Sequence, residues 1–284
     1  MRYDVAIIGT GPAGISAALT LTIRKKKILL FGSKELSKKV AGGHKIQNYP
    51  GFGQVTGDEL QKALQKHLQE MEIEIIEDRI GMIMTMGSYY MLQGSDPDVI
   101  YEASTVILAG GVAAVKTLPG EEEYLGEGVS YCATCDAGFC RGKDVTVIGY
   151  SPKEESEAEF LTQVAAKVTY IPMYKEEVEA KGLTVKRETP VSIKKEDTMI
   201  LLTGEGEYHT DQIFVLRDAV APNYLVPGLT MDGNHVAINR KTETNLKGLF
   251  AAGDITGTPY QYAKAVGEGN VAALQAVEYL ASLK

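Results

Sequence analysis

The chain has 284 residues, of which 44% are hydrophobic and 23% charged, and its net charge is −8. This composition excludes a disordered, collagen-like or coiled-coil chain and is ordinary for a globular protein of one large or two modest domains. The acidic balance argues against a nucleic-acid partner, because phosphate binding needs a basic surface. With no signal peptide, no unbroken apolar span and only three cysteines, the sequence predicts a cytoplasmic protein without membrane contact.

The first part of the chain has the pattern of a strand, a helix and a second strand. The predicted elements are a strand over Tyr3–Gly9, a helix over about Gly14–Arg24 and a strand over Lys27–Phe31. This βαβ order indicates a parallel sheet. Apolar residues recur at helical spacing over Gly57–Met71 and predict another helix. Further strands are predicted at Glu74–Ile76, Gly81–Met86, Tyr89–Leu92 and Thr105–Leu108.

A second βαβ pattern follows in the middle of the chain. It consists of a strand over Asp144–Gly149, a helix over Glu154–Val164 and a strand over Lys167–Ile171. A last strand, Gly248–Ala251, and a helix over about Ala263–Leu280 close the sequence. This closing pair is expected to pack on the first domain, since a segment of this size has no core of its own.

The order of these elements predicts the fold class and the domains. We expect an α/β protein with two Rossmann-like (three-layer ββα) domains. The first domain is predicted to be discontinuous and to consist of residues 1–112 and 236–284. The second domain, residues 113–235, is predicted to be inserted into it.

The turn after the first strand reads Gly-Thr-Gly-Pro-Ala-Gly and fits the dinucleotide-binding pattern G-x-G-x-x-G. Gly9 permits the tight turn, Gly11 lets the backbone approach a pyrophosphate, and Gly14 allows close packing of helix on strand. The phosphates would lie on the helix N-terminus. We therefore predict that Gly9, Gly11, Pro12, Ala13 and Gly14 bind a dinucleotide cofactor.

One part of the dinucleotide pattern is missing. An acid that binds the adenosine ribose is expected about 18–20 residues further on, at the end of the second strand. Gly32 stands at that position, and Glu35 falls in the following loop. We expect Ser33 or the backbone to contact the ribose instead.

Two cysteines, Cys132 and Cys135, lie between the two βαβ patterns in the sequence Cys-Ala-Thr-Cys-Asp. Two intervening residues allow the sulfurs to form a disulfide, and a helix N-terminus lowers the pKa of a thiol, so the spacing indicates a redox-active pair. A metal site would need two further ligands. Cys140 and the four scattered histidines do not have ligand spacing, so no metal is predicted. Cys140 is expected to be a buried apolar residue.

The segment Val129–Asp136, with Phe139 and residues 141–145 after it, strongly resembles the low-molecular-weight thioredoxin reductases. The similarity covers nearly the whole chain. It includes the segments Gly9–Gly14, Asn48–Phe52, Val106–Gly111 and Leu249–Asp254. The resemblance implies a homodimeric flavoprotein that binds FAD in the first domain, residues 1–112 and 236–284. Electrons would pass from FAD to the disulfide and from there to thioredoxin.

The resemblance also implies roles for individual residues. Cys135 would face the flavin, Cys132 would attack the disulfide of the partner, and Asp136 would be the proton donor and acceptor. From its position alone, Asp136 could equally be a partner of the helix dipole. Beyond the glycine turn, the resemblance implies FAD contacts by Asn48, Ala109, Gly110, Gly253, Asp254, Tyr260 and Gln261.

Two of these implied residues have alternative explanations. Asp254 would lie near the ribityl chain of the flavin, and a role as a helix N-cap is compatible with that position. Tyr260 stands where the family has arginine, so it could stack on the isoalloxazine in the place of a nicotinamide. A packing role for Tyr260 remains the alternative.

The second domain departs from the family pattern. Ordinary members bind NADPH through a glycine turn after its first strand, but here residues 149–154 read Gly-Tyr-Ser-Pro-Lys-Glu. Tyr150 puts a bulky side chain where the backbone should approach a phosphate, and Pro152 lacks the N–H that could donate to it. Four glutamates at residues 154, 155, 157 and 159 would repel a pyrophosphate. Residues 175–177 offer one lysine beside two glutamates where the family has arginines for the 2′-phosphate.

These losses predict that the second domain, residues 113–235, carries the redox disulfide on a degenerate pyridine-nucleotide-binding fold. They also predict that NADPH is not the electron donor. The chain has no cysteine set for an iron–sulfur cluster of its own, so the donor is expected to be another protein. Some thioredoxin reductases that lack the NADPH motifs resemble this chain and take electrons from ferredoxin, which is the predicted donor. Two alternatives stay open: the same enzyme class with an atypical NAD(P)H site, and a flavin/disulfide redox sensor that does not turn over.

Overall fold

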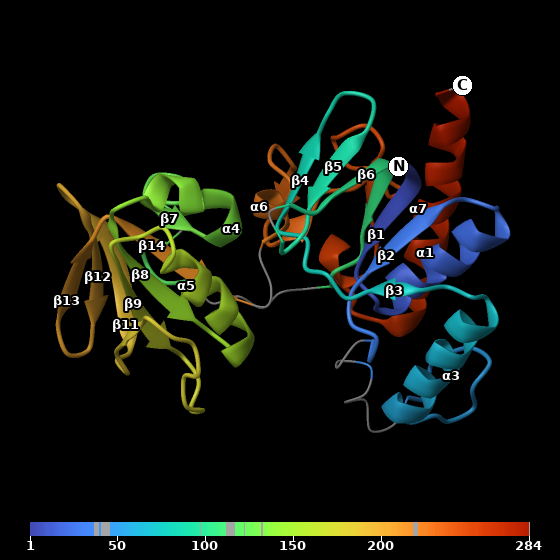
Figure 1. Ribbon diagram of the computed structural model, residues 1–284. Helices are drawn as coiled ribbons and strands as arrows, with labels where there is room; N and C mark the ends of the chain where they lie inside the picture. The colour runs from blue at the N-terminus through green and yellow to red at the C-terminus, as the bar shows by residue number, and fades with distance from the viewer. Residues whose placement is uncertain are drawn as a thin grey trace. The chain divides into compact units, whose positions relative to one another are not determined.

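The computed structural model describes residues 1–36, 40, 46–96, 98–111, 117–121, 123–131, 133–217 and 221–283, with residues 134 and 135 described by their backbone alone. The chain divides into two compact units, each with its own parallel sheet (Figure 1). The first unit is formed by Met1–Ala113 and Ala221–Lys284, and the second by Ala114–Val220. The predicted insertion of one unit into the other is therefore present.

The sheet of the first unit has the strand order β3-β2-β1-β6-β5-β4, with β17 paired to the second half of β6. Strands β1, β2, β3, β6 and β17 are parallel to one another, whereas β4 and β5 form an antiparallel hairpin next to β6. The bounds are β1 Tyr3–Ile8, β2 Ile28–Phe31, β3 Ile75–Ile76, β4 Met82–Thr85, β5 Tyr90–Gln93, β6 Ile100–Leu108 and β17 Leu249–Ala251. Continuous apolar runs such as that of β1 are typical of strands buried on both faces.

Two helices, α1 (Pro12–Ile23) and α7 (Tyr262–Ser282), lie side by side on one face of this sheet (Figure 1). They contact Val5 and Ile7 of β1 and approach each other closely: a Cβ added to Gly269 would lie 2.1 Å from the carbonyl oxygen of Ala13. The remaining elements of the unit are α3 Gly57–Glu70, α6 Pro222–Leu225, β15 Met231–Asp232, β16 His235–Val236 and the 3-10 turn η3 Asp254–Thr256.

The second unit has a parallel sheet of strand order β10-β9-β8-β14-β7. Short helices cover one face of it and an antiparallel sheet, β11-β12-β13, covers the other, which gives three layers. The strands are β7 Val129–Ser130, β8 Asp144–Gly149, β9 Lys167–Pro172, β10 Thr184–Val185, β11 Pro190–Lys195, β12 Met199–Thr203, β13 Glu207–Thr210 and β14 Gln212–Leu216. The helices are α4 Ala133–Asp136 and α5 Glu155–Leu161, with 3-10 turns η1 Ala137–Cys140 and η2 Pro152–Glu154.

The predicted α/β class with two Rossmann-like units is confirmed, and so are both βαβ patterns. The second boundary between the units differs from the prediction of residue 235/236, because the structure assigns residues 221–235 to the first unit. There, Val226 and Leu229 pack into the same apolar cluster as Leu249 and Ala251 of β17. The predicted helix over 154–164 is also shorter than expected and ends at Leu161.

Candidate functional site

The predicted cofactor residues of the first unit gather at one edge of its sheet. Strands β1, β6 and β17 are parallel, so the residues that follow them lie together at the carboxyl edge. Gly9 follows β1, Ala109 and Gly110 follow β6, and Gly253 and Asp254 come shortly after β17. In a doubly wound sheet this edge is the usual place for a ligand.

The glycine turn after β1 forms an open cradle. Gly9 has a φ of +118°, and a Cβ on it would lie 2.3 Å from the carbonyl oxygen of Ala109. A Cβ on Gly14 would lie 1.9 Å from the carbonyl oxygen of Gly9, so the helix sits directly on the turn. Apart from its chain neighbours, no described residue has an atom within 4 Å of the Cβ position of Gly11. Helix α1 has no side-chain cap and no acid in its first turn, which leaves room and backbone donors for a phosphate.

Gly32, where an acid that binds the ribose was expected, is in close contact with the side chain of Thr10. A Cβ on Gly32 would lie 2.6 Å from Oγ1 and 2.7 Å from Cγ2 of Thr10, a buried residue of the glycine turn. Thr10 Oγ1 donates a hydrogen bond to the carbonyl oxygen of Ser33 at 3.0 Å. Thr10 therefore occupies the space that an acidic side chain at position 32 would need.

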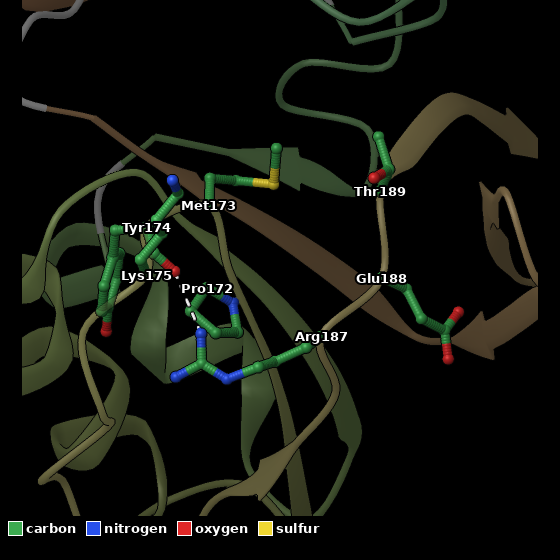
Figure 2. Close-up of a pocket in the computed structure, with 7 residues that line it drawn as sticks. All are labelled: Pro172, Met173, Tyr174, Lys175, Arg187, Glu188 and Thr189. Carbon is green, nitrogen blue, oxygen red and sulfur yellow. Dashed lines mark hydrogen bonds between the residues drawn. The ribbon is translucent and has the colours of Figure 1, made fainter.

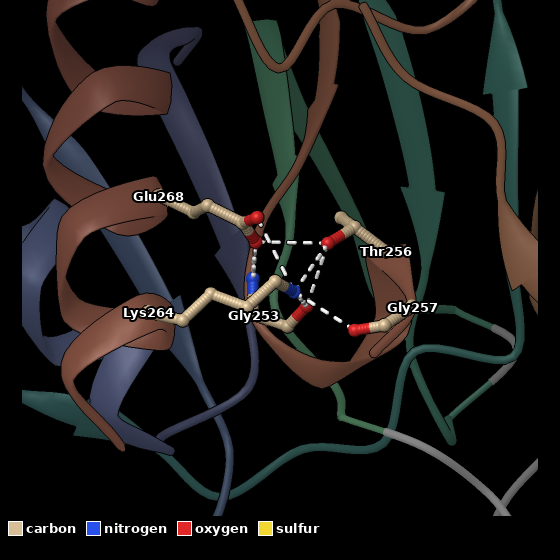
Figure 3. A network of polar contacts seen from close by, with 5 residues as sticks. All are labelled: Gly253, Thr256, Gly257, Lys264 and Glu268. Carbon is tan, nitrogen blue, oxygen red and sulfur yellow. Dashed lines mark hydrogen bonds and ion pairs between the residues drawn. The ribbon is translucent and has the colours of Figure 1, made fainter. Parts of the chain in front are cut away.

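Helix α7 holds the turn that contains Asp254 (Figure 3). Lys264 Nζ donates to the carbonyl oxygens of Gly253 and Gly257 at 3.0 and 2.9 Å and pairs with Glu268 at 3.2 Å. The carboxylate of Glu268 accepts the N–H of Gly253 and the hydroxyl of Thr256, both at 2.8 Å. These bonds fix both ends of the turn on the helix.

Three further predicted residues lie near the start of α7. The amide of Asn48 donates to Gln261 Oε1 at 2.8 Å, so these two predicted residues are brought together across the sequence. The hydroxyl of Tyr260 lies 2.6 Å from Nε2 of His235 on β16. Tyr260 is about half exposed, so its ring is accessible.

The redox motif lies at the carboxyl edge of the second unit, after β7. Cys135 and Asp136 are on the short helix α4, whereas Cys132 lies outside the described residues. Helix α4 begins at the residue that follows Cys132, in agreement with a cysteine placed before a helix N-terminus. The N–H of Ala133 donates to the carboxylate of Glu157 on α5 at 3.2 Å. Glu157 thus supports the start of the helix that carries Cys135 and Asp136.

The third cysteine has a different environment. Cys140 is fully buried, and its thiol donates to Gln212 Oε1 at 3.1 Å. Burial raises the pKa of this thiol to about 11, so it is protonated at neutral pH. The prediction that Cys140 is a buried residue is confirmed.

The carboxyl edge of the second unit is filled by side chains where the first unit is open. Arg217, which follows β14, forms two hydrogen bonds with the carboxylate of Glu121, one of them at 2.7 Å. Its guanidinium lies 4.5 Å from the centre of the ring of Tyr150, which follows β8. Glu121 is 0% and Arg217 8% exposed. Tyr150, the residue after the first glycine of this turn, is thus held against a buried ion pair at this edge.

Comparison with known proteins assigns the family. Residues 3–269 match the family of pyridine nucleotide-disulphide oxidoreductases. The chain belongs to this family. It is 34% identical to a thioredoxin reductase of Peptoclostridium litorale, over 99% of this chain and 98% of that protein. Two crystal structures of a ferredoxin-flavin thioredoxin reductase from Clostridium acetobutylicum are 45% and 46% identical, with TM-scores of 0.83 and 0.92, and cover at least 99% of both chains.

Thioredoxin reductases are FAD-binding members of this family, and the first unit fits that cofactor. The open space over Gly11 and the uncapped N-terminus of α1 suit the pyrophosphate. The turn that carries Asp254 is rigidly held on the same edge. The residues that follow β1, β6 and β17 therefore share one edge of the sheet, and the contacts of the predicted residues with FAD stay predictions.

Several site residues were not found from the sequence. Lys264 and Glu268 are spaced four apart on a partly buried face of helix α7, and this charge pair was the signal available. His235, Thr10 and Glu157 have no comparable signal, because their partners are distant in sequence.

In the part of the chain that the structure describes, no cluster of three metal-binding side chains is present. Across those same residues, none of the helices has the length and apolar character needed to cross a membrane.

Proposed function

We propose that this protein is a flavin-dependent thioredoxin reductase that takes electrons from a protein donor, ferredoxin. The electrons would pass through FAD and the Cys132–Cys135 disulfide to thioredoxin. Asp136, on the same helix as Cys135, would supply and accept the proton during thiol–disulfide exchange. FAD, when bound, supplies the redox chemistry that links the donor to the disulfide.

The contrast between the two carboxyl edges is the observation that carries this proposal. The first unit leaves its glycine turn open, with no described atom beyond the chain neighbours within 4 Å of the Cβ position of Gly11. The second unit has a serine, residue 151, at the equivalent position, and its edge carries Tyr150 packed on the buried pair of Arg217 and Glu121. One dinucleotide site is therefore expected, for FAD, and electrons must arrive by another route than NAD(P)H. The similarity to a ferredoxin-flavin thioredoxin reductase supports a protein donor.

The redox potentials are compatible with this direction of transfer. A ferredoxin at roughly −400 mV lies about 130 mV below thioredoxin at roughly −270 mV, which is about 6 kcal/mol for two electrons. The proposal further includes thioredoxin as the acceptor, a homodimeric assembly and a cytoplasmic location.

The test is an anaerobic absorption spectrum of the FAD-loaded protein with three donors added in turn. We expect reduced ferredoxin to bleach the flavin and NADPH and NADH to leave it oxidised, with thioredoxin then reduced over many turnovers. The Cys135→Ser variant should retain flavin reduction by ferredoxin and lose thioredoxin reduction. Rapid bleaching by NADPH would instead support an atypical nucleotide site, and disulfide exchange without turnover would support a redox sensor.

A further inference from the structure

The loop that follows β9 is tied to the start of helix α5 by one carboxylate. Glu155 is the first residue of α5 and is only 7% exposed. Its Oε2 accepts the N–H groups of Glu179 and Ala180 at 2.8 and 3.0 Å, and its Oε1 accepts the hydroxyl of Tyr174. Three donors of the loop 173–181 are thus bound to an internal acid.

The charge states of Glu155 and Tyr174 strengthen the hydrogen bond between them. Burial alone would raise the pKa of Glu155, but the hydrogen bonds from Tyr174, Ala180 and Glu179 outweigh it and leave this pKa lowered. Burial and the bond to Glu155 raise the pKa of Tyr174. At neutral pH the carboxylate is therefore ionised and the phenol is a donor, so the bond is charge-assisted.

A buried tyrosine extends this network to the glycine that ends β8. The hydroxyl of Tyr170 lies 3.2 Å from that of Tyr174, and a Cβ on Gly149 would lie 2.0 Å from the Tyr170 hydroxyl. Gly149 is the one glycine that remains of the second nucleotide turn. Its place in the structure is explained by packing against Tyr170, without any phosphate.

The loop is also held from its other side by an arginine (Figure 2). Arg187 donates through Nη1 to the carbonyl oxygen of Tyr174 at 3.0 Å and through Nη2 to that of Glu176 at 2.6 Å. A groove of about 400 Å³ lies between this arginine and the end of β9. Arg187 lines this groove beside the end of β9, where a 2′-phosphate would be expected, and two of its donors are already used by the loop.

We propose that Glu155, Tyr174 and Arg187 form a latch that closes the loop 173–181 between the end of β9 and the start of α5 and thereby excludes a dinucleotide from the second unit. A dinucleotide at this edge would need backbone N–H groups and a basic side chain for its phosphates. In the latch, the N–H groups of Glu179 and Ala180 are bound to an internal carboxylate, and two donors of Arg187 are bound to backbone carbonyls of the same loop. This inference rests on the proposed function, in which it determines that electrons come from a protein and not from a nucleotide.

The test compares two single-charge removals on the same helix. Glu155→Ala opens the latch, whereas Glu159→Ala removes an equal charge from a side chain that forms no hydrogen bond or ion pair with a described residue. Binding of NADPH to each FAD-loaded variant is measured by calorimetry, and hydrogen exchange follows the amides of Glu179 and Ala180. We expect Glu155→Ala to bind NADPH at least tenfold more tightly than Glu159→Ala and to exchange both amides at least tenfold faster.

Equal NADPH affinity in the two variants would overturn the latch as a specificity device, even if the loop becomes more mobile. Glu155→Ala leaves three buried donors without a hydrogen-bond partner, so a second variant, Glu155→Gln, keeps the shape of the side chain. Glu155→Gln is also expected to bind NADPH more tightly than Glu159→Ala. In the unaltered protein, NADPH should not slow the hydrogen exchange of the loop amides. Slower exchange would mean that NADPH binds there while the latch is closed, and this would also overturn the proposal. Ferredoxin-dependent flavin reduction is recorded in each sample, so failure of the proposed function is seen separately.

Discussion

Gly11 and Gly14 belong to one turn, but they are glycines for different reasons. Alanine fits at Gly11, where no described residue other than the chain neighbours has an atom within 4 Å of the Cβ, whereas at Gly14 it would meet the carbonyl oxygen of Gly9 at 1.9 Å. We expect Gly11→Ala to change the free energy of unfolding of the FAD-free protein by less than about 0.5 kcal/mol. The same variant should weaken FAD binding at least about tenfold, which is about 1.4 kcal/mol. Gly14→Ala should destabilise the FAD-free protein by about 1–3 kcal/mol.

Urea unfolding of both FAD-free variants and fluorescence titration with FAD separate these effects. Equal losses of stability in the two variants would contradict a cradle that is open only at Gly11. Unchanged FAD affinity in Gly11→Ala would place the cofactor elsewhere.

The sequence could predict the roles of the first glycine turn, because they follow from a local pattern of strand, turn and helix. It could not explain Gly32 or Gly149. The space at Gly32 is occupied by Thr10, and the space at Gly149 by Tyr170, and each neighbour comes from another strand or turn. A pattern of residues along the chain does not contain these contacts. The sequence therefore identified Gly149 as a remnant of a phosphate turn, where the structure gives it a packing role.

At the scale of elements, long and apolar segments were predicted best. Strands β1 and β8 and helix α7 have continuous apolar runs or helical periodicity, and these signals survive without knowledge of the fold. The antiparallel sheet of β11, β12 and β13 was not predicted. Its strands mix lysine, threonine and glutamate with apolar residues, since only one face is buried against the parallel sheet.

Helix α7 offers a test of how an element positions the cofactor turn. Glu268→Gln keeps the shape of the side chain but removes the charge that pairs with Lys264 and that accepts the N–H of Gly253. We expect the Kd for FAD to rise about tenfold, about 1.4 kcal/mol, because the turn with Asp254 is less well fixed. Glu278→Gln, an exposed position of the same helix, is the matched control and should bind FAD normally. A fall in stability with an unchanged Kd would restrict the pair to a structural role.

At the scale of the whole molecule, the chain passes between the two units twice. The segment that enters the second unit contains Glu121, and the segment that leaves it contains Arg217. Their buried ion pair joins these two segments, which are 96 residues apart. Because each unit has its own sheet and its own apolar clusters, this arrangement allows the two units to differ in stability.

This independence predicts where FAD stabilises the protein. A ligand that binds one unit at about 100 times its Kd stabilises that unit by about 2.7 kcal/mol. The predicted contacts lie in the first unit, so the slowest amides of β1 and α7 should exchange about 100-fold more slowly with FAD than without it. The amides of β8 and β9 should change little, because the latch of Glu155 and the pair of Arg217 and Glu121 already fill the equivalent edge. Hydrogen exchange of the two forms, read by mass spectrometry, measures both sets at once. Equal protection in both units would mean that they unfold as one cooperative body, whereas protection confined to β8 and β9 would place the dinucleotide in the second unit.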